Sequence, residues 1–289
     1  MKENAKAFAK INISLDITSK MPDGYHDMLM VMQTVSLCDD VTIECTPGVG
    51  VEVKTNLEYI PSDVRNIAAK TALAFFESTG IKGYKTKINI KKNIPVAAGL
   101  GGGSADGACV LRTLNSMFSS NLSAKQLEAI GMPVGADIPF CISGGTQLAQ
   151  GRGEVLSDLA PLADCYIVIC KPNFSFSTPE LFRRIRCEKI RFRPDTDALI
   201  EALAQGSLLE TARRMYNVFE DFLPRGADEI ESIKYTLLDS GAIGAIMTGS
   251  GSSVFGLFDE IADAESAVKR LKTQYKSCFL TQPQRKIEL

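Results

Sequence analysis

The chain has 289 residues, 45% of them hydrophobic and 23% charged, and 32 basic against 34 acidic side chains give a net charge of −2. This length fits about two domains, and the near-neutral balance argues against a nucleic acid or an anionic membrane as the main partner. Lys6, Lys10 and Asn12 interrupt the apolar start, and no later apolar run has the roughly 18 residues of a membrane span, so we expect a cytoplasmic protein.

Alternating apolar residues predict strands near the start of the chain. Residues 7–17 (AFAKINISLDI) are apolar at every second position, and residues 39–55 (DDVTIECTPGVGVEVKT) are typical of a hairpin that turns at residues 47–50. Residues 84–92 alternate in the same way and predict a further strand.

Helical patterns stand on both sides of that last strand. Residues 61–80 predict a helix with Ser62 or Asp63 as its N-cap and a glycine at its end. Apolar side chains recur at helical spacing over residues 108–118. The glycine-rich segment between residues 92 and 108 therefore joins a strand to a helix.

The second half of the chain predicts another mixed unit. Residues 165–170 (CYIVIC) are typical of a buried strand, and residues 196–221 contain helical material. Residues 242–258 predict two strands around a second glycine-rich turn, and a helix over 262–275 and a strand over 278–281 follow. No repeat or linker is present, so element order alone divides the α+β chain into domains 1–155 and 156–289.

The eight cysteines form no C-x-x-C pair, and most of them stand in apolar segments. This distribution is typical of reduced core residues. His26 is the only histidine, which excludes a metal site built from several histidines.

Residues 95–108 (PVAAGLGGGSADGA) predict a phosphate-binding loop. Glycines let several backbone N–H groups converge, and a helix N-terminus adds unpaired amides and a positive dipole end. A tight turn without a ligand is the alternative, although one or two glycines would suffice for it. The segment lacks the lysine of the GxxxxGK(S/T) loop, and Ser104 occupies the last glycine position of GxGxxG. A nicotinamide-dinucleotide oxidoreductase is therefore disfavoured, and protein-kinase signatures are also absent.

This loop resembles the PxxxGLG(S/G)(S/G)S(A/S)A motif of the GHMP kinases, which are named after galactokinase, homoserine kinase, mevalonate kinase and phosphomevalonate kinase. Three further regions fit the same family in order and spacing: AKINISLDI with DGYH at 23–26, GADIPFCISGGTQLAQGRGE at 135–154, and MTGSGSSVFGLF at 247–258. The resemblance covers nearly the whole chain. The DGYH segment is similar to that of the members acting on cytidine-diphosphate-linked methylerythritol.

The resemblance implies ATP-dependent phosphorylation of the 2-hydroxyl of that compound, a step of non-mevalonate isoprenoid precursor synthesis. It implies a GHMP kinase fold with a ribosomal protein S5 domain 2-like N-terminal domain and a ferredoxin-like C-terminal domain, and an active site between them. ATP and Mg²⁺ would be the cofactors, and Ser104 could help to hold the metal. The partner would be a small molecule, and we expect a monomer or weak homodimer without nucleic acid or membrane partners.

Two charged residues fit the chemistry of phosphoryl transfer, which needs a proton acceptor and positive charge near the γ-phosphoryl group. Asp137 stands between small and apolar residues, where partial burial suits a general base; an N-cap or turn aspartate is the alternative. Lys10 lies on an apolar strand and could pair with Asp137; a lysine on an edge strand is the alternative. Asn12 projects to the same face as Lys10 and could bind a substrate hydroxyl.

By resemblance, Tyr25, His26 and Phe182 hold the cytosine ring, although Phe174 and Phe176 stand close to Phe182 in the sequence, and Thr178 also contacts the substrate. The residues implied in ATP binding are Pro95, Gly99, Leu100, Gly101, Gly102, Gly103, Ser104, Asn66 and Lys92. For the last two, a helix-start asparagine and an exposed strand-end lysine are alternatives. The residues implied in covering the site are Thr248, Gly249, Ser250, Gly251 and Ser252, for which a simple turn between strands is the alternative.

The sequence departs from the family motif at Ala105, where a second serine often stands, and at Gly107, where alanine is usual. Glycine inside a helix costs up to about 1 kcal/mol relative to alanine. Two other functions remain open: a kinase for another small alcohol, such as homoserine or mevalonate, and a noncatalytic nucleotide-binding protein.

Overall fold

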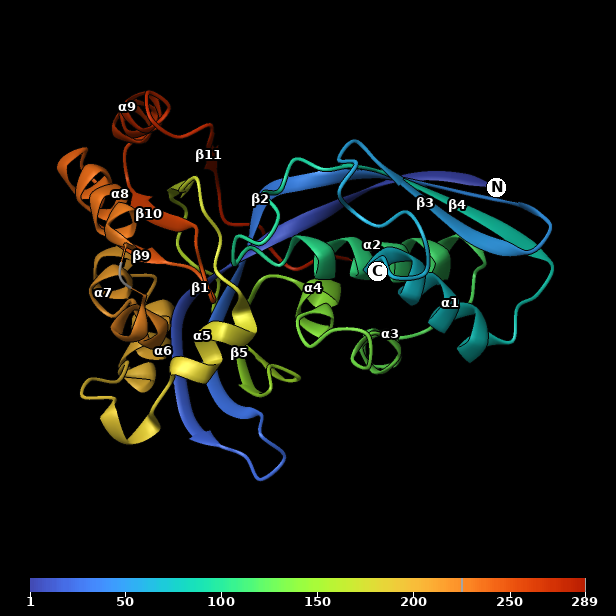
Figure 1. The fold of residues 1–289 in the computed structure, drawn as a ribbon, viewed down its shortest axis with the longest axis horizontal. Helices are drawn as coiled ribbons and strands as arrows, with labels where there is room; N and C mark the ends of the chain where they lie inside the picture. The colour runs from blue at the N-terminus through green and yellow to red at the C-terminus, as the bar shows by residue number, and fades with distance from the viewer. Residues whose placement is uncertain (225, 289) are drawn as a thin grey trace.

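The computed structural model describes residues 1–224 and 226–288 and contains two sheets (Figure 1). In the larger sheet the strands follow the order β3-β4-β2-β1-β8, and β5 pairs with both β2 and β6. These strands are β1 (Lys2–Lys20), β2 (His26–Pro47), β3 (Gly50–Thr55), β4 (Tyr84–Lys91), β5 (Thr146–Gly151), β6 (Val155–Asp158) and β8 (Tyr216–Asn217).

Strand β1 has two chemically different faces. Ile11, Ile13, Leu15 and Ile17 are buried in the core, whereas Lys10, Asn12, Ser14 and Asp16 occupy the alternate positions and are buried as well. Successive side chains of a strand point to opposite faces, so the second set forms a row of buried polar side chains on the face opposite the apolar ones. Strand β1 therefore carries Lys10 and Asn12 into the interior side by side.

The hairpin expected over residues 39–55 is wrong. Strand β4 lies between β2 and β3, antiparallel to β2 and parallel to β3. The turn after β2 is fastened to the start of β4, because Gly48 N donates to Gly83 O at 3.0 Å. The alternation of residues 39–55 predicts two strands but not which strands they pair with. The apolar positions of β4 allow that strand to pair with β2 on one side and β3 on the other.

Helices α1 (Ile67–Thr79), α2 (Gly102–Met117) and α4 (Ile138–Ser143) pack on one face of the larger sheet, and α3 (Ala124–Gly131) packs on these helices (Figure 1). The helix expected over 61–80 begins later than predicted. Its N-cap is Asn66, whose Oδ1 accepts the N–H of Ala68 at 2.9 Å, while Asp63 binds Arg65 instead. Its end at Gly80, in the left-handed conformation with φ 70°, is confirmed.

The smaller sheet has the order β11-β7-β10-β9 and is antiparallel. Its strands are β7 (Tyr166–Lys171), β9 (Gly244–Met247), β10 (Val254–Phe258) and β11 (Ser277–Thr281). Helices α8 (Asp228–Asp239) and α9 (Ile261–Leu271) pack on the side facing away from the larger sheet (Figure 1). The strands expected around the second glycine-rich turn and at residues 165–170 are confirmed.

The helical material expected over residues 196–221 is only partly helical. It consists of α6 (Thr196–Ala204), α7 (Leu208–Arg213), the two-residue strand β8 and the 3-10 helix η2 (Val218–Phe222). Helix α5 (Thr178–Arg184) and the 3-10 helix η1 (Cys187–Lys189) precede them. Strand β8 pairs with β1 in parallel, so this part of the chain adds an edge to the larger sheet.

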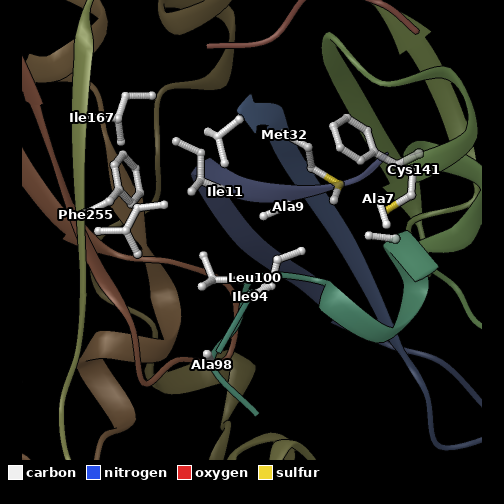
Figure 2. Packing of buried hydrophobic residues seen from close by; sticks show 14 of the residues in the cluster. Ala7, Ala9, Ile11, Met32, Ile94, Ala98, Leu100, Cys141, Ile167 and Phe255 are labelled. Carbon is white, nitrogen blue, oxygen red and sulfur yellow. The ribbon is translucent and has the colours of Figure 1, made fainter. Parts of the chain in front are cut away.

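The two sheets share one hydrophobic core. Ile11 and Leu100 from the first half of the chain and Ile167 and Phe255 from the smaller sheet belong to one buried cluster (Figure 2). All eight cysteines are free thiols, and six of them are buried, as expected for reduced core residues. Over the described residues, no helix is both long and apolar enough to cross a membrane.

Candidate active site

A cavity of about 660 Å³ lies between the glycine-rich loop, β1 and the turn after β9. Most of the residues predicted from the sequence line it. They are Lys10, Asn12, Asn66, Lys92, Pro95, Gly99, Leu100, Gly101, Gly102, Gly103, Ser104, Asp137, Thr178, Phe182, Gly249, Ser250 and Gly251. Tyr25, His26, Thr248 and Ser252 are not among the lining residues, although each contacts or flanks the same region.

The glycine-rich loop ends in the N-terminus of α2. The N-cap Gly101 has φ 66° and no side chain, so no side-chain oxygen occupies the first amides of the helix. A Cβ at Gly99 would lie 2.1 Å from the Thr248 carbonyl oxygen, and one at Gly101 would lie 2.9 Å from Lys10 Cγ. The loop thus packs tightly on its neighbours and leaves free donors beside a cavity, which suits an anion.

Lys10 and Asp137 face each other at the cavity wall. The distance between Lys10 Nζ and Asp137 Oδ2 is 3.7 Å, and Lys10 Nζ also donates to Asn12 Oδ1 at 2.7 Å. Lys10 is 5% exposed, and its backbone N–H donates to Leu100 O at 3.1 Å, so the glycine-rich loop covers β1 at this point, unlike the open edge of a sheet. Asp137 stands at the N-cap of α4, but its side chain caps no amide, and it remains 34% exposed to the cavity. A carboxylate with an ammonium beside it is available there to accept a proton.

Lys92 is buried rather than exposed at the end of its strand. Its ammonium binds the carboxylate of Asp39, that of Asp106 at 2.6 Å and the carbonyl oxygen of Gly102 at 3.4 Å. Asp39 Oδ1 in turn accepts the N–H groups of Asn93 and Ile94 at 2.5 and 2.8 Å. The cluster of Lys92, Asp39 and Asp106 therefore ties the end of β4 to the start of α2 beneath the loop.

The cluster holds two carboxylates and one ammonium. Burial raises the pKa of Asp106 to about 7; Lys92 opposes this rise and Asp39 adds to it. Burial lowers the pKa of Lys92, but Asp106 and Asp39 raise it by more, so the net shift is upward. Sequence reasoning missed both aspartates. The usable signal was the lysine itself, because a buried ammonium needs an anionic partner.

Asn66 is the N-cap of α1 and also lines the cavity. Its Oδ1 caps Ala68, and its Nδ2 donates to Pro61 O at 2.8 Å. The helix-start alternative is therefore what the side chain does in this structure. Any contact with a nucleotide would come from the cavity side of the same residue.

The turn at residues 248–252 lies over Lys10 and Asn12. Thr248 Oγ1 accepts the N–H of Asn12 at 2.9 Å, and a Cβ at Gly249 would lie 3.3 Å from Lys10 Nζ. Ser250 Oγ and Thr178 Oγ1 share a hydrogen bond of 2.7 Å, and Ser252 Oγ donates to the Phe174 carbonyl oxygen. The turn is thus held against both β1 and the start of α5.

Aromatic side chains form part of the cavity wall. The rings of His26 and Phe182 stack with centroids 5.0 Å apart, and Phe219 meets Phe182 edge-on. Phe176 and Phe182 line the cavity, whereas Phe174 does not. Burial, followed by the charge of Lys20, lowers the pKa of His26, which favours a neutral imidazole.

Tyr25 takes a different place, at the tip between β1 and β2, where it is 58% exposed. The guanidinium of Arg152 lies 4.0 Å from the centre of its ring and also binds Asp23. Tyr25 and Phe182 therefore do not form two parallel walls in this structure. Arg152, which lines the cavity, was not predicted from the sequence, where only its two flanking glycines mark it.

Comparison with known proteins gives one consistent family. The family described as GHMP kinases N terminal domain matches residues 66–145, and the one described as GHMP kinases C terminal matches residues 199–277. A protein of Clostridium kluyveri named 4-diphosphocytidyl-2-C-methyl-D-erythritol kinase is 43% identical over 96% of this chain and 98% of its own. A protein of Clostridium botulinum with the same name is 42% identical over the same shares.

Solved structures agree with these relatives. The crystal structure of a 4-(cytidine 5'-diphospho)-2C-methyl-D-erythritol kinase is 30% identical, has a TM-score of 0.81 and covers 97% of this chain and 99% of its own. The homoserine kinase of Cytophaga hutchinsonii is 19% identical, with a TM-score of 0.74 over 99% and 96% of the two chains, and shares the fold.

Proposed function

The chain belongs to the GHMP kinases and, among them, to the 4-diphosphocytidyl-2-C-methyl-D-erythritol kinases, and we propose how its residues carry out that reaction. The enzyme transfers the γ-phosphoryl group of ATP to the 2-hydroxyl of 4-diphosphocytidyl-2-C-methyl-D-erythritol and releases ADP. This reaction is a step of non-mevalonate isoprenoid precursor synthesis.

The observation that carries the proposed mechanism is the meeting of Lys10, Asp137 and the N-terminus of α2 in one cavity. Asp137 accepts the proton of the 2-hydroxyl as its oxygen attacks the γ-phosphorus. Lys10 lies beside Asp137 and stabilises the negative charge that spreads over the phosphoryl oxygens during the transfer. The free amides of residues 101–104 bind the phosphates that remain with ADP.

Mg²⁺, bound mainly to the ATP phosphates, would neutralise further charge during the transfer. The described residues contain no group of three or more His, Cys, Asp or Glu side chains arranged for a metal. Mg²⁺ bound with ATP needs only one or two protein oxygens, because phosphates and waters supply the others. Ser104 and Asp137, whose side chains border the cavity, are the oxygens suited to it.

We assign substrate selection to the aromatic side chains in and beside the cavity wall. Tyr25, His26 and Phe182 would hold the cytosine, and Asn12 and Thr178 the remainder of the substrate. This proposal is supported by the stack of His26 on Phe182 and by the position of Phe182 in the cavity wall. In this arrangement the base would enter beside the stacked pair, and Tyr25 would close over it from the strand tip.

Three broader features belong to the same proposal. The chain divides near residue 155 into an N-terminal domain with the phosphate loop and a C-terminal domain on the substrate side. It acts in the cytoplasm as a monomer or weak homodimer.

A coupled ADP-release assay tests the function. We expect turnover with 4-diphosphocytidyl-2-C-methyl-D-erythritol and none above background with mevalonate or homoserine. Asp137→Asn should lower kcat by about 10²- to 10⁴-fold with ATP binding retained, because an amide cannot act as the base. Asp195→Asn, at the N-cap of α6, is the matched control and should keep wild-type turnover. Preference for another alcohol, or an Asp137→Asn rate within threefold of wild type, would contradict the assignment.

A further inference from the structure

The turn after β9 needs an accurate position, because it lies in contact with the residues assigned to catalysis. A Cβ placed on Gly249 would lie 3.3 Å from both Lys10 Nζ and Asn12 Oδ1. The turn itself is built mainly of glycine and serine, which constrain the backbone little. Other parts of the chain must therefore fix its place.

Asn217 is the side chain that holds this turn from behind. Its Nδ2 donates to the carbonyl oxygens of Met247 and Gly249, both at 2.8 Å, and its Oδ1 accepts the N–H of Phe219 at 3.0 Å. Asn217 is 2% exposed. Both amide hydrogens and the amide oxygen thus have partners, which fixes the orientation of the group and leaves no amide hydrogen free for a ligand.

The backbone of Asn217 is joined to the strand that carries Lys10. Strand β8 pairs with β1 in parallel, with Tyr216 opposite Ser14 and Asn217 opposite Leu15. One residue therefore connects β1 with the turn over it. The hydrogen bond from Asn12 N to Thr248 Oγ1 joins the same two segments from the other side.

Glu220 fixes the start of the turn. Its Oε1 accepts the N–H of Met247 at 2.7 Å, and its Oε2 accepts from Lys234 Nζ at 2.6 Å. Burial raises the pKa of Glu220, and the charge of Lys234 opposes that rise. The ammonium of Lys234 is thus the charge partner of this buried carboxylate, whose other oxygen accepts the backbone N–H of Met247.

We infer that Asn217 and Glu220 are positioning residues of the kinase reaction: they fix residues 247–249 relative to β1 and thereby set the geometry of the turn over Lys10. The inference rests on the proposed function of Lys10 and of the turn. Neither residue lines the cavity, so neither is expected to touch the substrates.

Asn217→Ala tests the inference. Without the two bonds the turn moves relative to Lys10, so kcat should fall by about 10- to 100-fold, the cost of a misplacement near 1 Å. The KM values for ATP and for the cytidyl substrate should stay within about threefold. Asn115→Ala is the matched control, because Asn115 also bonds backbone, donating to Leu122 O and accepting from Leu122 N far from the cavity. It should lower stability but keep kcat.

Glu220 provides an independent pair of variants. Glu220→Gln retains an oxygen for the N–H of Met247 but loses the charge pair with Lys234, so stability should fall while kcat stays near wild type. Glu220→Ala loses both bonds, so kcat should fall as in Asn217→Ala. A role in stability alone would instead make kcat of the two variants equal.

Amide hydrogen exchange separates this inference from the proposed function. Asn217→Ala should speed exchange in a peptide covering residues 247–253 and leave residues 116–124 unchanged. If Asn217→Ala speeds exchange over residues 247–253 but the wild-type protein does not phosphorylate the cytidyl substrate, the proposed function is overturned and the positioning of the turn stands. Unchanged exchange with unchanged kcat would overturn the positioning. If Asn217→Ala does not fold, Asn217→Ser, which leaves room for a water, replaces it with the same expected outcomes.

Discussion

At the residue scale, the cluster of Lys92, Asp39 and Asp106 makes stability depend on pH. The ammonium of Lys92 can fully compensate one carboxylate but not two, so burial holds the pKa of Asp106 near 7 instead of 3.8. Between these values the folded protein keeps a proton that the unfolded chain releases. The free energy of unfolding therefore falls as pH rises through this window.

Asp106→Asn should remove this dependence, because an amide does not titrate. Relative to wild type, the variant should gain about 3 kcal/mol of unfolding free energy between pH 5 and pH 8, from 1.4 kcal/mol per pH unit over the roughly two units below the folded pKa. Urea unfolding at four pH values would measure it. Asp158→Asn is the control with the opposite sign: the hydrogen bond with Lys286 lowers the pKa of Asp158, so its contribution is lost only in acid. A difference between Asp106→Asn and wild type that does not change with pH would contradict this account.

Single residues could be predicted from the sequence where their own surroundings were unusual. Lys10 stands out because it interrupts an apolar strand, and the structure buries it beside Asp137. The partners of Lys92 could not be predicted in this way, because Asp39 lies 53 residues before it and Asp106 14 residues after it. Only the order of strands β2 and β4 and the position of α2 bring the three together.

At the scale of elements, the glycine-rich loop has glycines for more than one reason. From the sequence, the glycines were predicted to let several backbone N–H groups converge on a phosphate. The structure adds that Gly99 must pass the carbonyl oxygen of Thr248 and that Gly101 must pass the side chain of Lys10. For Gly107 the sequence indicated only a loss of helix stability. In the structure it lets α1 approach α2, since a Cβ added at Gly107 would lie 3.0 Å from side-chain atoms of Ile67 and Thr71.

Gly101→Ala should therefore affect catalysis through Lys10. The new Cβ would lie 2.9 Å from Lys10 Cγ, and the displaced ammonium should leave Asp137 and Asn12, lowering kcat more than about 10-fold. Gly206→Ala is a closely matched control, because Gly206 has φ 65° against 66° for Gly101 and no atom within 4 Å of its Cβ. Both variants should lose about 1 to 2 kcal/mol of stability from left-handed strain. Equal kcat in the two, measured by ADP release, would rule out the contact with Lys10 as the cause.

The types of most elements could be predicted from hydrophobic periodicity, whereas their pairing could not. Residues 39–55 form two strands as expected, but β4 separates them, because pairing depends on a segment 30 or more residues later. The short strand β8 was missed since two residues carry no periodic pattern. That strand holds Asn217, so the missed element is also the one that positions the turn over Lys10.

At the scale of the whole molecule, the two halves of the chain are interlaced. Strand β8 joins the larger sheet from the second half, and the C-terminal residues return to the first half, where Pro283 bridges Val35 and Lys286 bridges Gly144 (Figure 1). A division from element order cannot include such returns, because they depend on contacts across more than 100 residues. The cavity consequently receives Lys10 and the glycine-rich loop from one half and Phe176, Phe182 and the second turn from the other.

This arrangement predicts that binding of the cytidyl substrate and binding of ATP can be weakened separately by substitutions in different parts of the cavity wall. Phe182→Ala removes the aromatic face that stacks on His26 in the cavity wall, so KM for the cytidyl substrate should rise about 5- to 150-fold, as a stacking energy of about 1 to 3 kcal/mol requires. KM for ATP should stay within about twofold. Phe174→Ala is the matched control, because Phe174 packs on Phe176 without lining the cavity, and it should leave both KM values near wild type. Steady-state kinetics with each substrate varied in turn would measure this. If Phe182→Ala instead weakened ATP, or if Phe174→Ala raised KM for the cytidyl substrate as much, the base would have to bind elsewhere in the cavity.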